Sequence, residues 1–344
     1  MRLYVVGVNR PSRPPLYGLE VGRRRRRRRL PAVRVPPPAA IALVLVAVLA
    51  AGSGFVAFRL WPLTDRSAGV IAASVASAPH TGRGSGPPVA APLLPMSAAK
   101  AARVHIRGVR ARAGIVIDSA SGSVLWAHEA HMRLPMASLT KLMTALLALP
   151  QQSALDRKFV VTPAMVGVPG YTIGLRAGTR VTVRHMLAAA LIASANDAAN
   201  VLAVHRSGSV QAFVRAMNAT AARLGLSDTR YSNPSGIFDA GNHSSAWDVA
   251  DLSRRVLDRP LLRSFVGRKA YQAGAAVYVN RNRLLWSYTG AIGIKTGSTT
   301  AAGNCLAVAA VRHGRTVIGV LLHVRGDEFA AARRLLNWGF RHDR

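Results

Sequence analysis

The feature that most constrains the fold of this chain is a change of hydrophobic period along residues 113–340. Residues 113–118 and 123–127 have the apolar character of a strand hairpin, and Gly122 lies in the turn between them. Segments with helical spacing follow, and strand-like segments return after residue 274. Because the strand-like segments lie at both ends of this region, we expect one α+β domain whose sheet combines both chain ends.

Turn and capping residues give approximate limits to these elements. Gly225 ends one helical segment, and Pro260 follows another that begins with a serine. The expected helices begin at Ser138 and otherwise cover residues 183–191, 196–205, 209–224, 245–257 and 328–340. The expected strands of the second half cover residues 275–280, 283–287, 291–296, 304–311 and 316–324.

The N-terminal third differs in composition from this domain. Residues 1–38 are rich in Arg and Pro without an apolar period, which predicts a disordered basic tail in the cytoplasm. Residues 39–60 include 20 consecutive uncharged residues, enough for a helix of about 30 Å that crosses a bilayer. Residues 61–102 are rich in Ala, Pro, Gly and Ser and are expected to be a linker, so that the folded domain covers residues 103–344.

The positive charge before the apolar segment sets its expected orientation. Seven consecutive arginines occupy residues 23–29, whereas only Arg59 follows directly, so the N-terminus should stay in the cytoplasm and the domain should lie outside. The alternative is a cleaved signal peptide, because small residues at 50–54 could form a cleavage site. We favour an uncleaved anchor because the apolar stretch is long for a signal core.

Charge and composition exclude little by themselves. The net charge of +32 is compatible with a cytoplasmic nucleic-acid binder, but that reading leaves the apolar segment unexplained. The arginine run is instead typical of a membrane-proximal anchor beside anionic lipid. Cys305 is the only cysteine, which excludes an intramolecular disulfide, and its apolar strand suggests a buried small side chain. The histidines lack the spacing of metal ligands, so no metal is expected.

The helix that begins at Ser138 contains a lysine, Lys141, among almost exclusively apolar residues, in a chain with only five lysines. The two side chains are three residues apart and so face the same side of a helix. Burial lowers the pKa of an amine, and a neutral lysine can act as a general base beside a serine hydroxyl, which arginine cannot do. In isolation, a snorkelling lysine and a capping serine would explain the pair equally well.

Two further motifs follow in the order typical of penicillin-interacting serine enzymes. Ser194 and Asn196 form an S-x-N triplet at a junction between expected helices. Lys295, Thr296 and Gly297 form a K-T-G triplet on an expected strand. Each motif lies on the kind of element that its chemistry requires, so the combination is a far stronger signal than any one motif.

With these motifs, residues 112–340 resemble the serine-type D-alanyl-D-alanine carboxypeptidases, the low-molecular-mass penicillin-binding proteins. The resemblance extends to residues 133–149, 191–203, 217–253 and 290–310. It implies a β-lactamase/penicillin-binding-protein-like α+β fold, with an antiparallel five-stranded sheet flanked by helices and an α-helical subdomain. It implies no cofactor. Because about 45 residues follow the K-T-G motif, the extra C-terminal β domain of some relatives is not expected.

The resemblance also implies a role for each motif residue. Ser138 would be the nucleophile, Lys141 its base and Ser194 the proton relay to the departing amine. The implied oxyanion hole consists of the backbone N–H groups of Ser138 and Ser298. Ser298 stands where the family often has a larger side chain, which could alter specificity. The expected substrate-binding residues are Asn196, Lys295, Thr296, Gly297 and Ser298.

The expected protein is therefore a single-pass bacterial membrane enzyme whose extracytoplasmic domain trims the terminal D-alanine from peptidoglycan stem peptides. Its expected partners are those peptides, β-lactam antibiotics and the membrane, without nucleic acid. A D,D-endopeptidase remains open. A class A β-lactamase is disfavoured because residues 130–327 contain no glutamate and the middle motif is SAN instead of SDN. An inactive wall-binding module is disfavoured by the intact motifs.

Several polar residues near the motifs are expected to be structural. Asp197 should cap or orient the following helix. Asn233, Pro234 and Gly236 should form a turn near the site, and His243 should lie in a surface turn.

Overall fold

The computed structural model describes residue 93 and residues 105–237 and 241–342. The predicted tail, transmembrane segment and nearly all of the predicted linker lie outside these residues, so those boundaries stay predictions. In the part of the chain that is described, no helix is both long and apolar enough to cross a membrane.

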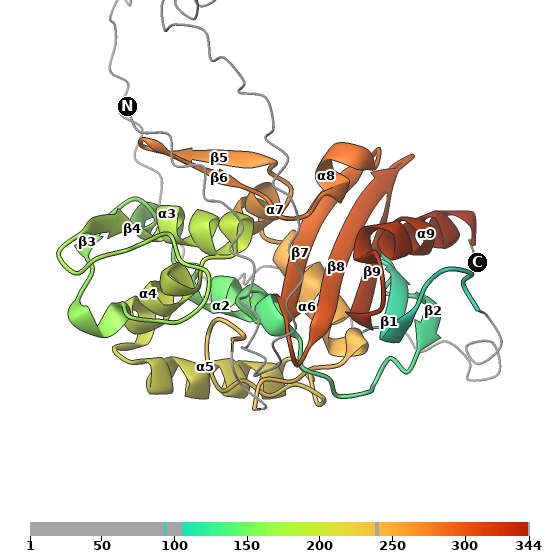
Figure 1. The fold of residues 1–344 in the computed structure, drawn as a ribbon, viewed down its shortest axis with the longest axis horizontal. Coiled ribbons are helices and arrows are strands. Elements are labelled where there is room, and N and C mark those ends of the chain that lie inside the picture. Colours follow the sequence, from blue (N-terminus) through green and yellow to red (C-terminus); the bar gives the residue numbers. More distant parts are fainter. Residues whose placement is uncertain (1–92, 94–104, 238–240, 343–344) are drawn as a thin grey trace, which may run out of the picture. The chain divides into compact units, whose positions relative to one another are not determined.

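The centre of the domain is an antiparallel five-stranded sheet of order β2-β1-β9-β8-β7 (Figure 1). Strand β1 pairs with β9, so that the first strand of the domain lies beside the last, as the predicted α+β arrangement requires. The catalytic-motif strand β7 is at one edge. The five strands are β1 (Ala111–Asp118), β2 (Val124–His128), β7 (Ala291–Thr299), β8 (Gly303–Arg312) and β9 (Arg315–Val324).

Alternation along the strands gives the sheet two apolar faces. Ile115 and Ile117 of β1 belong to one buried cluster, whereas Val116 between them belongs to the other. The C-terminal helix α9 (Glu328–Arg341) covers the second face, and α6 (Ala246–Leu257) lies against the first (Figure 1). Both faces of the sheet are thus buried, which holds β7 rigidly in place.

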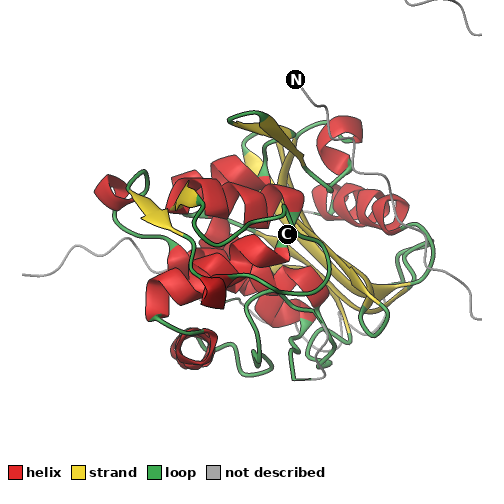
Figure 2. Cartoon of the chain, turned by 60° about the vertical axis from the view of Figure 1, so that its left-hand side comes forward, coloured by secondary structure: helices red, strands yellow, loops and turns green. Residues whose placement is uncertain are grey.

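The remaining helices gather beside the sheet as a helical subdomain (Figure 2). Helix α4 is buried along residues 196–204 and contacts α2, α3 and α5. Ser209 and Ser245 cap α5 and α6 by accepting hydrogen bonds from Ala212 N and Asp248 N. The helices are α2 (Lys141–Ala148), α3 (Val183–Ala188), α4 (Asn196–Ser207), α5 (Val210–Arg223) and α7 (Pro260–Val266).

One expected strand is a helix. Residues 283–287 contain α8 (Leu284–Ser287), in which the adjacent Leu284 and Leu285 are 0% and 7% exposed. Two consecutive buried residues do not fit one face of a strand. The Asn282 side chain also accepts a hydrogen bond from Leu284 N, two residues later, which forms a local turn before the helix.

Most short elements outside the central sheet were not predicted. Strand β6 (Ala276–Val279) was expected, but it pairs with β5 (Ala270–Ala273) in a separate hairpin. The expected helix 183–191 is interrupted by a π-helical segment at Ala189–Ala193. The other short elements are β3 (Lys158–Val160), β4 (Arg180–Thr182) and the 3-10 turns Ala137–Thr140, Gln152–Ala154 and Pro163–Met165. Three-residue elements carry too little periodicity to be recognised.

Candidate active site

Ser138 and Lys141 lie one turn apart at the start of the buried helix. Ser138 is within the 3-10 turn Ala137–Thr140, and Lys141 is the first residue of α2. The Lys141 amine lies 2.9 Å from Ser138 Oγ. Lys141 is 0% exposed, whereas Ser138 is partly exposed. The amine is therefore shielded from water while the hydroxyl beside it remains reachable.

The Lys141 amine has three oxygen neighbours, and a neutral amine satisfies all three when the Ser138 hydroxyl is the donor. Its Nζ lies 2.7 Å from Ser235 O and 2.8 Å from Asn196 Oδ1, both of which can only accept hydrogen bonds. The orientation of the Asn196 amide is determined, because its Nδ2 donates to Pro169 O at 2.9 Å. A neutral amine has two N–H groups for these acceptors, and its lone pair is then left to accept the Ser138 hydroxyl proton.

Ser194 and Lys295 form a second hydroxyl–amine pair. Lys295 Nζ donates to Ser194 Oγ at 2.8 Å and to Thr296 O at 3.0 Å. Ser194 follows the π-helical segment Ala189–Ala193 and has the left-handed backbone angles φ 65° and ψ 30°. This conformation is strained for a residue with a side chain, and such strain concentrates at functional sites.

The edge strand β7 lies directly against the turn that carries Ser138. A Cβ atom added to Gly297 would lie 2.9 Å from Ser138 N and 3.1 Å from Met136 O. Only glycine permits this approach, because both atoms belong to the backbone. Gly297, the residue before Ser298, therefore lies against the Ser138 backbone, and the two groups expected to form the oxyanion hole lie on adjoining segments.

Burial and like charges shift the pKa values of both lysines. Burial, followed by the charges of Lys295 and Arg281, lowers the pKa of Lys141 well below its ordinary value, although Asp197 opposes this. Burial and then Arg281 lower the pKa of Lys295 to about 7. Lys141 is therefore suited to be a base, and Lys295 titrates near neutrality.

Arg281 is a functional candidate that sequence reasoning missed. It is exposed, and its guanidinium carbon lies 4.1 Å from the centre of the Tyr171 ring. Tyr171 in turn accepts a hydrogen bond from Asn196 N through its backbone oxygen, at 2.8 Å. No local motif surrounds this arginine, and only the fold brings its charge near the two lysines.

Asp197 supports the loop that includes Tyr171. Its carboxylate accepts hydrogen bonds from Ile173 N and Leu175 N, each at 3.0 Å, and from Ala198 N at 2.9 Å. These contacts hold the loop on the first turn of α4, which agrees with the expected structural role.

The expected turn near the site supplies a contact that the sequence analysis did not foresee. Asn233 Oδ1 accepts hydrogen bonds from Ser235 N and Gly236 N, which directs Ser235 O to Lys141. His243 forms a backbone bridge with Arg230 and makes none of the hydrogen bonds to either lysine.

Two polar residues extend the site beyond the K-T-G motif. The Ser298 hydroxyl donates to Asn304 Oδ1 at 3.0 Å, and Asn304 Nδ2 donates to Glu328 Oε2 at 3.1 Å. Cys305, the neighbour of Asn304, is 1% exposed, and burial raises the pKa of its thiol to about 11. Cys305 is thus an unreactive buried side chain, as expected.

Comparison with protein families gives one match over most of the domain. Residues 98–326 match the family described as D-alanyl-D-alanine carboxypeptidase. The carboxypeptidase of Streptomyces sp. strain K15 is 33% identical over 256 residues, which are 67% of this chain and 88% of the relative. The D-alanyl-D-alanine endopeptidase of Escherichia coli is 31% identical over 266 residues, which are 73% of this chain and 84% of the relative.

Some relatives are longer than the matched region. D-alanyl-D-alanine carboxypeptidase DacF of Bacillus subtilis is 34% identical over 223 residues, which are 61% of this chain but only 57% of DacF. Among solved structures, the DD-transpeptidase of Streptomyces K15 has a TM-score of 0.66 at 31% identity and covers 70% of this chain and 100% of its own. This likeness confirms the expected penicillin-binding-protein-like fold.

Proposed function

The chain belongs to the D-alanyl-D-alanine carboxypeptidase family, and we propose that it hydrolyses the terminal D-alanyl-D-alanine bond of peptidoglycan stem peptides through an acyl-enzyme on Ser138. The observation that carries this proposal is the meeting of two serines and two lysines from separate segments. Ser138 lies 2.9 Å from the Lys141 amine, and Ser194 lies 2.8 Å from that of Lys295.

Acylation begins with a proton transfer that needs no rearrangement of the amine. Ser138 Oγ gives its proton to the lone pair of Lys141 and attacks the carbonyl carbon between the two D-alanines. The two N–H groups of Lys141 remain bound to Ser235 O and Asn196 Oδ1 throughout. The new ammonium then stabilises the developing charge through its third N–H group.

The tetrahedral oxyanion accepts hydrogen bonds from the backbone N–H groups of Ser138 and Ser298. The close approach of β7 at Gly297 supports this pairing. Ser194 relays the proton that Lys141 took from Ser138 to the departing D-alanine amine. Lys141 is then neutral again and can take a proton from the water that hydrolyses the ester and frees Ser138. Lys295, Thr296 and Arg281 present positive charge and a hydroxyl to the terminal carboxylate of the substrate, and Asn196 orients its amide.

The anchor belongs to the same proposal. The domain works outside the cytoplasm of a bacterium, held to the membrane by residues 39–60. The support is the uncharged stretch and the arginine-rich segment before it.

Fluorescent penicillin tests the acyl-enzyme, and released D-alanine tests the reaction. The wild-type protein should become covalently labelled and should release D-alanine from a synthetic pentapeptide ending in D-Ala-D-Ala, whereas Ser138→Ala should do neither. Equal labelling of both proteins would reject Ser138 as the nucleophile. Rapid turnover of the penicillin would favour a β-lactamase.

A D,D-endopeptidase is the second candidate, because a D-alanyl-D-alanine endopeptidase is among the similar proteins. A cross-linked muropeptide dimer distinguishes the two activities. Release of monomers faster than release of terminal D-alanine would make the endopeptidase the principal activity.

A further inference from the structure

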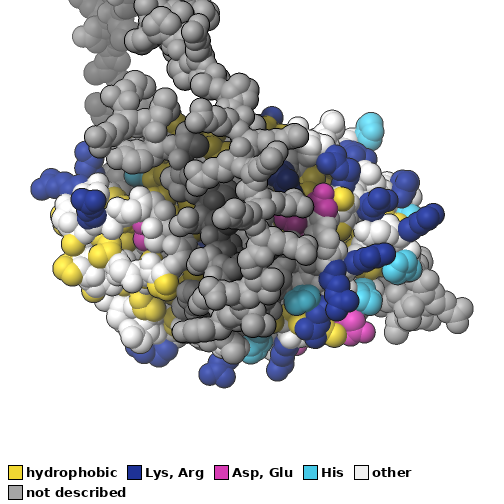
Figure 3. All heavy atoms as spheres, in the orientation of Figure 1, with side chains coloured by type: hydrophobic (Ala, Val, Ile, Leu, Met, Phe, Trp, Pro, Cys, Tyr) yellow, Lys and Arg dark blue, Asp and Glu magenta, His cyan; other side chains and the backbone are white. Residues whose placement is uncertain are grey.

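A pocket of about 300 Å³ lies on the α9 side of the domain, away from the catalytic motifs. It forms where the first residues of the continuous described chain meet the C-terminal helix. Figure 3 shows Lys and Arg side chains gathered on the side where Figure 1 places α9. The polar residues that line the pocket are His105, Arg107, Arg334, Asn337, Trp338 and Arg341.

The backbone holds two of these arginines together. Val109 N donates to Ile106 O at 3.0 Å, which closes a turn with Arg107 and Gly108 at its centre, and Ile106 and Val109 are buried. Gly108 has φ +81°, and a Cβ atom there would lie 2.8 Å from Arg334 Nε. The Arg334 side chain therefore lies against this turn, and the positive φ of Gly108 favours glycine there.

The α9 face supplies the other groups. Arg334, Asn337, Trp338 and Arg341 have the spacing i, i+3, i+4 and i+7, which is one side of a helix. Asn337 Oδ1 accepts hydrogen bonds from Tyr288 Oη at 2.9 Å and from an Arg312 nitrogen at 3.2 Å. Its oxygen is thus engaged, and the Asn337 NH₂ group is the part left to donate.

Among the residues that the structure describes, no ion pair balances the charges of this pocket. None of the ion pairs found among residues 105–237 and 241–342 includes Arg107, Arg334 or Arg341. The residues that line the pocket include no carboxylate. The helix dipole accounts for Arg341 near the end of α9, but not for Arg334 in its middle or for Arg107 on another segment.

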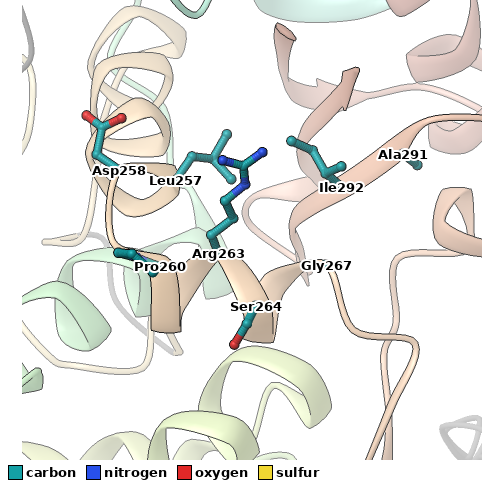
Figure 4. A pocket seen from close by; sticks show the side chains of 8 residues that line it. All are labelled: Leu257, Asp258, Pro260, Arg263, Ser264, Gly267, Ala291 and Ile292. Carbon is teal, nitrogen blue, oxygen red and sulfur yellow. The ribbon is translucent and has the colours of Figure 1, made fainter. Parts of the chain in front are cut away.

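A second cavity of the protein is lined differently, since it is not dominated by arginine side chains. The cavity between α6, α7 and β7 has about 580 Å³ (Figure 4). Its lining combines Arg263 with the carboxylate of Asp258 and the apolar side chains of Leu257 and Ile292. The α9 pocket instead presents guanidinium and N–H donors, which complement a ligand that has only acceptor oxygens.

We propose that the α9 pocket binds a phosphate group, with Arg107, Arg334 and Arg341 as its cationic ligands and Asn337 as a neutral donor. Guanidinium groups suit phosphate because they donate paired hydrogen bonds in a planar fork. The phosphate can come from the headgroup of an anionic phospholipid or from a free phosphate in solution. The site is separate from the proposed peptidase reaction.

Calorimetric titration of the full-length chain in a neutral detergent tests this site. The two probes are inorganic phosphate and soluble dihexanoyl phosphatidylglycerol. Arg334→Gln should weaken binding roughly tenfold, and Arg334→Gln with Arg341→Gln should weaken it further. Tighter binding of the lipid than of inorganic phosphate assigns the site to a headgroup, and equal binding assigns it to free phosphate.

The matched control is Arg215→Gln, which removes the same charge from an exposed position on α5. This variant should bind both probes like the wild type, and all variants should keep penicillin labelling as evidence of folding. The proposal fails if neither probe binds saturably. It also fails if Arg334→Gln binds like the wild type, or if Arg215→Gln weakens binding equally.

Discussion

At the scale of single residues, the reactivity of the site depends on the surroundings of two amines. Lys141 and Lys295 are 0% and 2% exposed, and each is close to a serine hydroxyl. Burial disfavours the charged form of an amine, and each positive neighbour disfavours it further. The same lysine on the protein surface would stay protonated at neutral pH and could not accept a proton from serine.

Replacing the proposed base by arginine tests this dependence. Lys141→Arg keeps a cation but removes the lone pair, because arginine does not deprotonate in proteins. Acylation by fluorescent penicillin should slow about 1,000-fold, as expected when a general base is lost. Lys158→Arg on the exposed strand β3 is the control and should acylate normally. An active Lys141→Arg variant would exclude Lys141 as the base.

Arg281 should set the pH range of activity. The proposed reaction needs Lys141 neutral and Lys295 protonated, so kcat/KM should rise with pH as Lys141 deprotonates and fall as Lys295 deprotonates, at a pKa of about 7. Arg281 lowers the pKa of both lysines. Arg281→Gln should therefore move both limbs of the profile to higher pH. Unmoved limbs, or limbs at lower pH, would contradict this assignment.

At the scale of elements, the site is a junction between strained turns and a sheet edge. Ala137 has a φ angle of 49° and directly precedes Ser138. Ser194, the other serine of the site, has a φ angle of 65°. Packing against β7 and α4 holds these conformations, because isolated chains would avoid them. The buried sheet thus supplies the rigidity that keeps the hydroxyl groups in position.

The contact between β7 and the Ser138 turn can be opened by one methyl group. Gly297→Ala should push the strand away from Ser138 N and reduce acylation at least 100-fold, because misplacement of about 1 Å has that effect. Gly314→Ala, in the β8–β9 turn, meets no atom within 4 Å but has φ +75°.

Gly314→Ala is the control, because it strains the backbone at a turn without displacing any part of the active site. It should destabilise the protein by about 1 kcal/mol and lower Tm by about 3 °C without slowing acylation. Thermal unfolding and penicillin labelling of the same samples separate the two effects. Equal acylation by Gly297→Ala and the wild type would show that the approach of β7 does not matter for catalysis.

At the scale of the whole molecule, the prediction concerns the N-terminal segment. If residues 39–60 anchor the chain, the full-length protein should remain in the membrane fraction after an alkaline wash. Alkaline phosphatase fused after residue 344 should be active, because this reporter enzyme becomes active only outside the cytoplasm. A shorter protein found free of the membrane would instead support a cleaved signal peptide.

The sequence by itself determined the local features of this protein. The spacing of Ser138 and Lys141 on one helix turn, the S-x-N and K-T-G motifs and the strand-like segments at both chain ends are all properties of neighbouring residues. They were sufficient to predict the family, and the resemblance to that family implied the five-stranded sheet that the structure has. The segment 283–287 was predicted wrongly because its apolar run fits either a strand or a helix.

Tertiary structure alone decided which groups surround those motifs. The acceptors at Lys141 include Ser235 O, and the Asn196 amide is oriented by Pro169 O; backbone oxygens have no sequence signature, since every residue carries one. The charge of Arg281 and the cluster at Arg107 and Arg334 likewise depend on segments far apart in the chain. The strength of an electrostatic effect depends on the distance between the charges and on their burial. Both are properties of the folded structure, so these neighbours could not be predicted from the sequence.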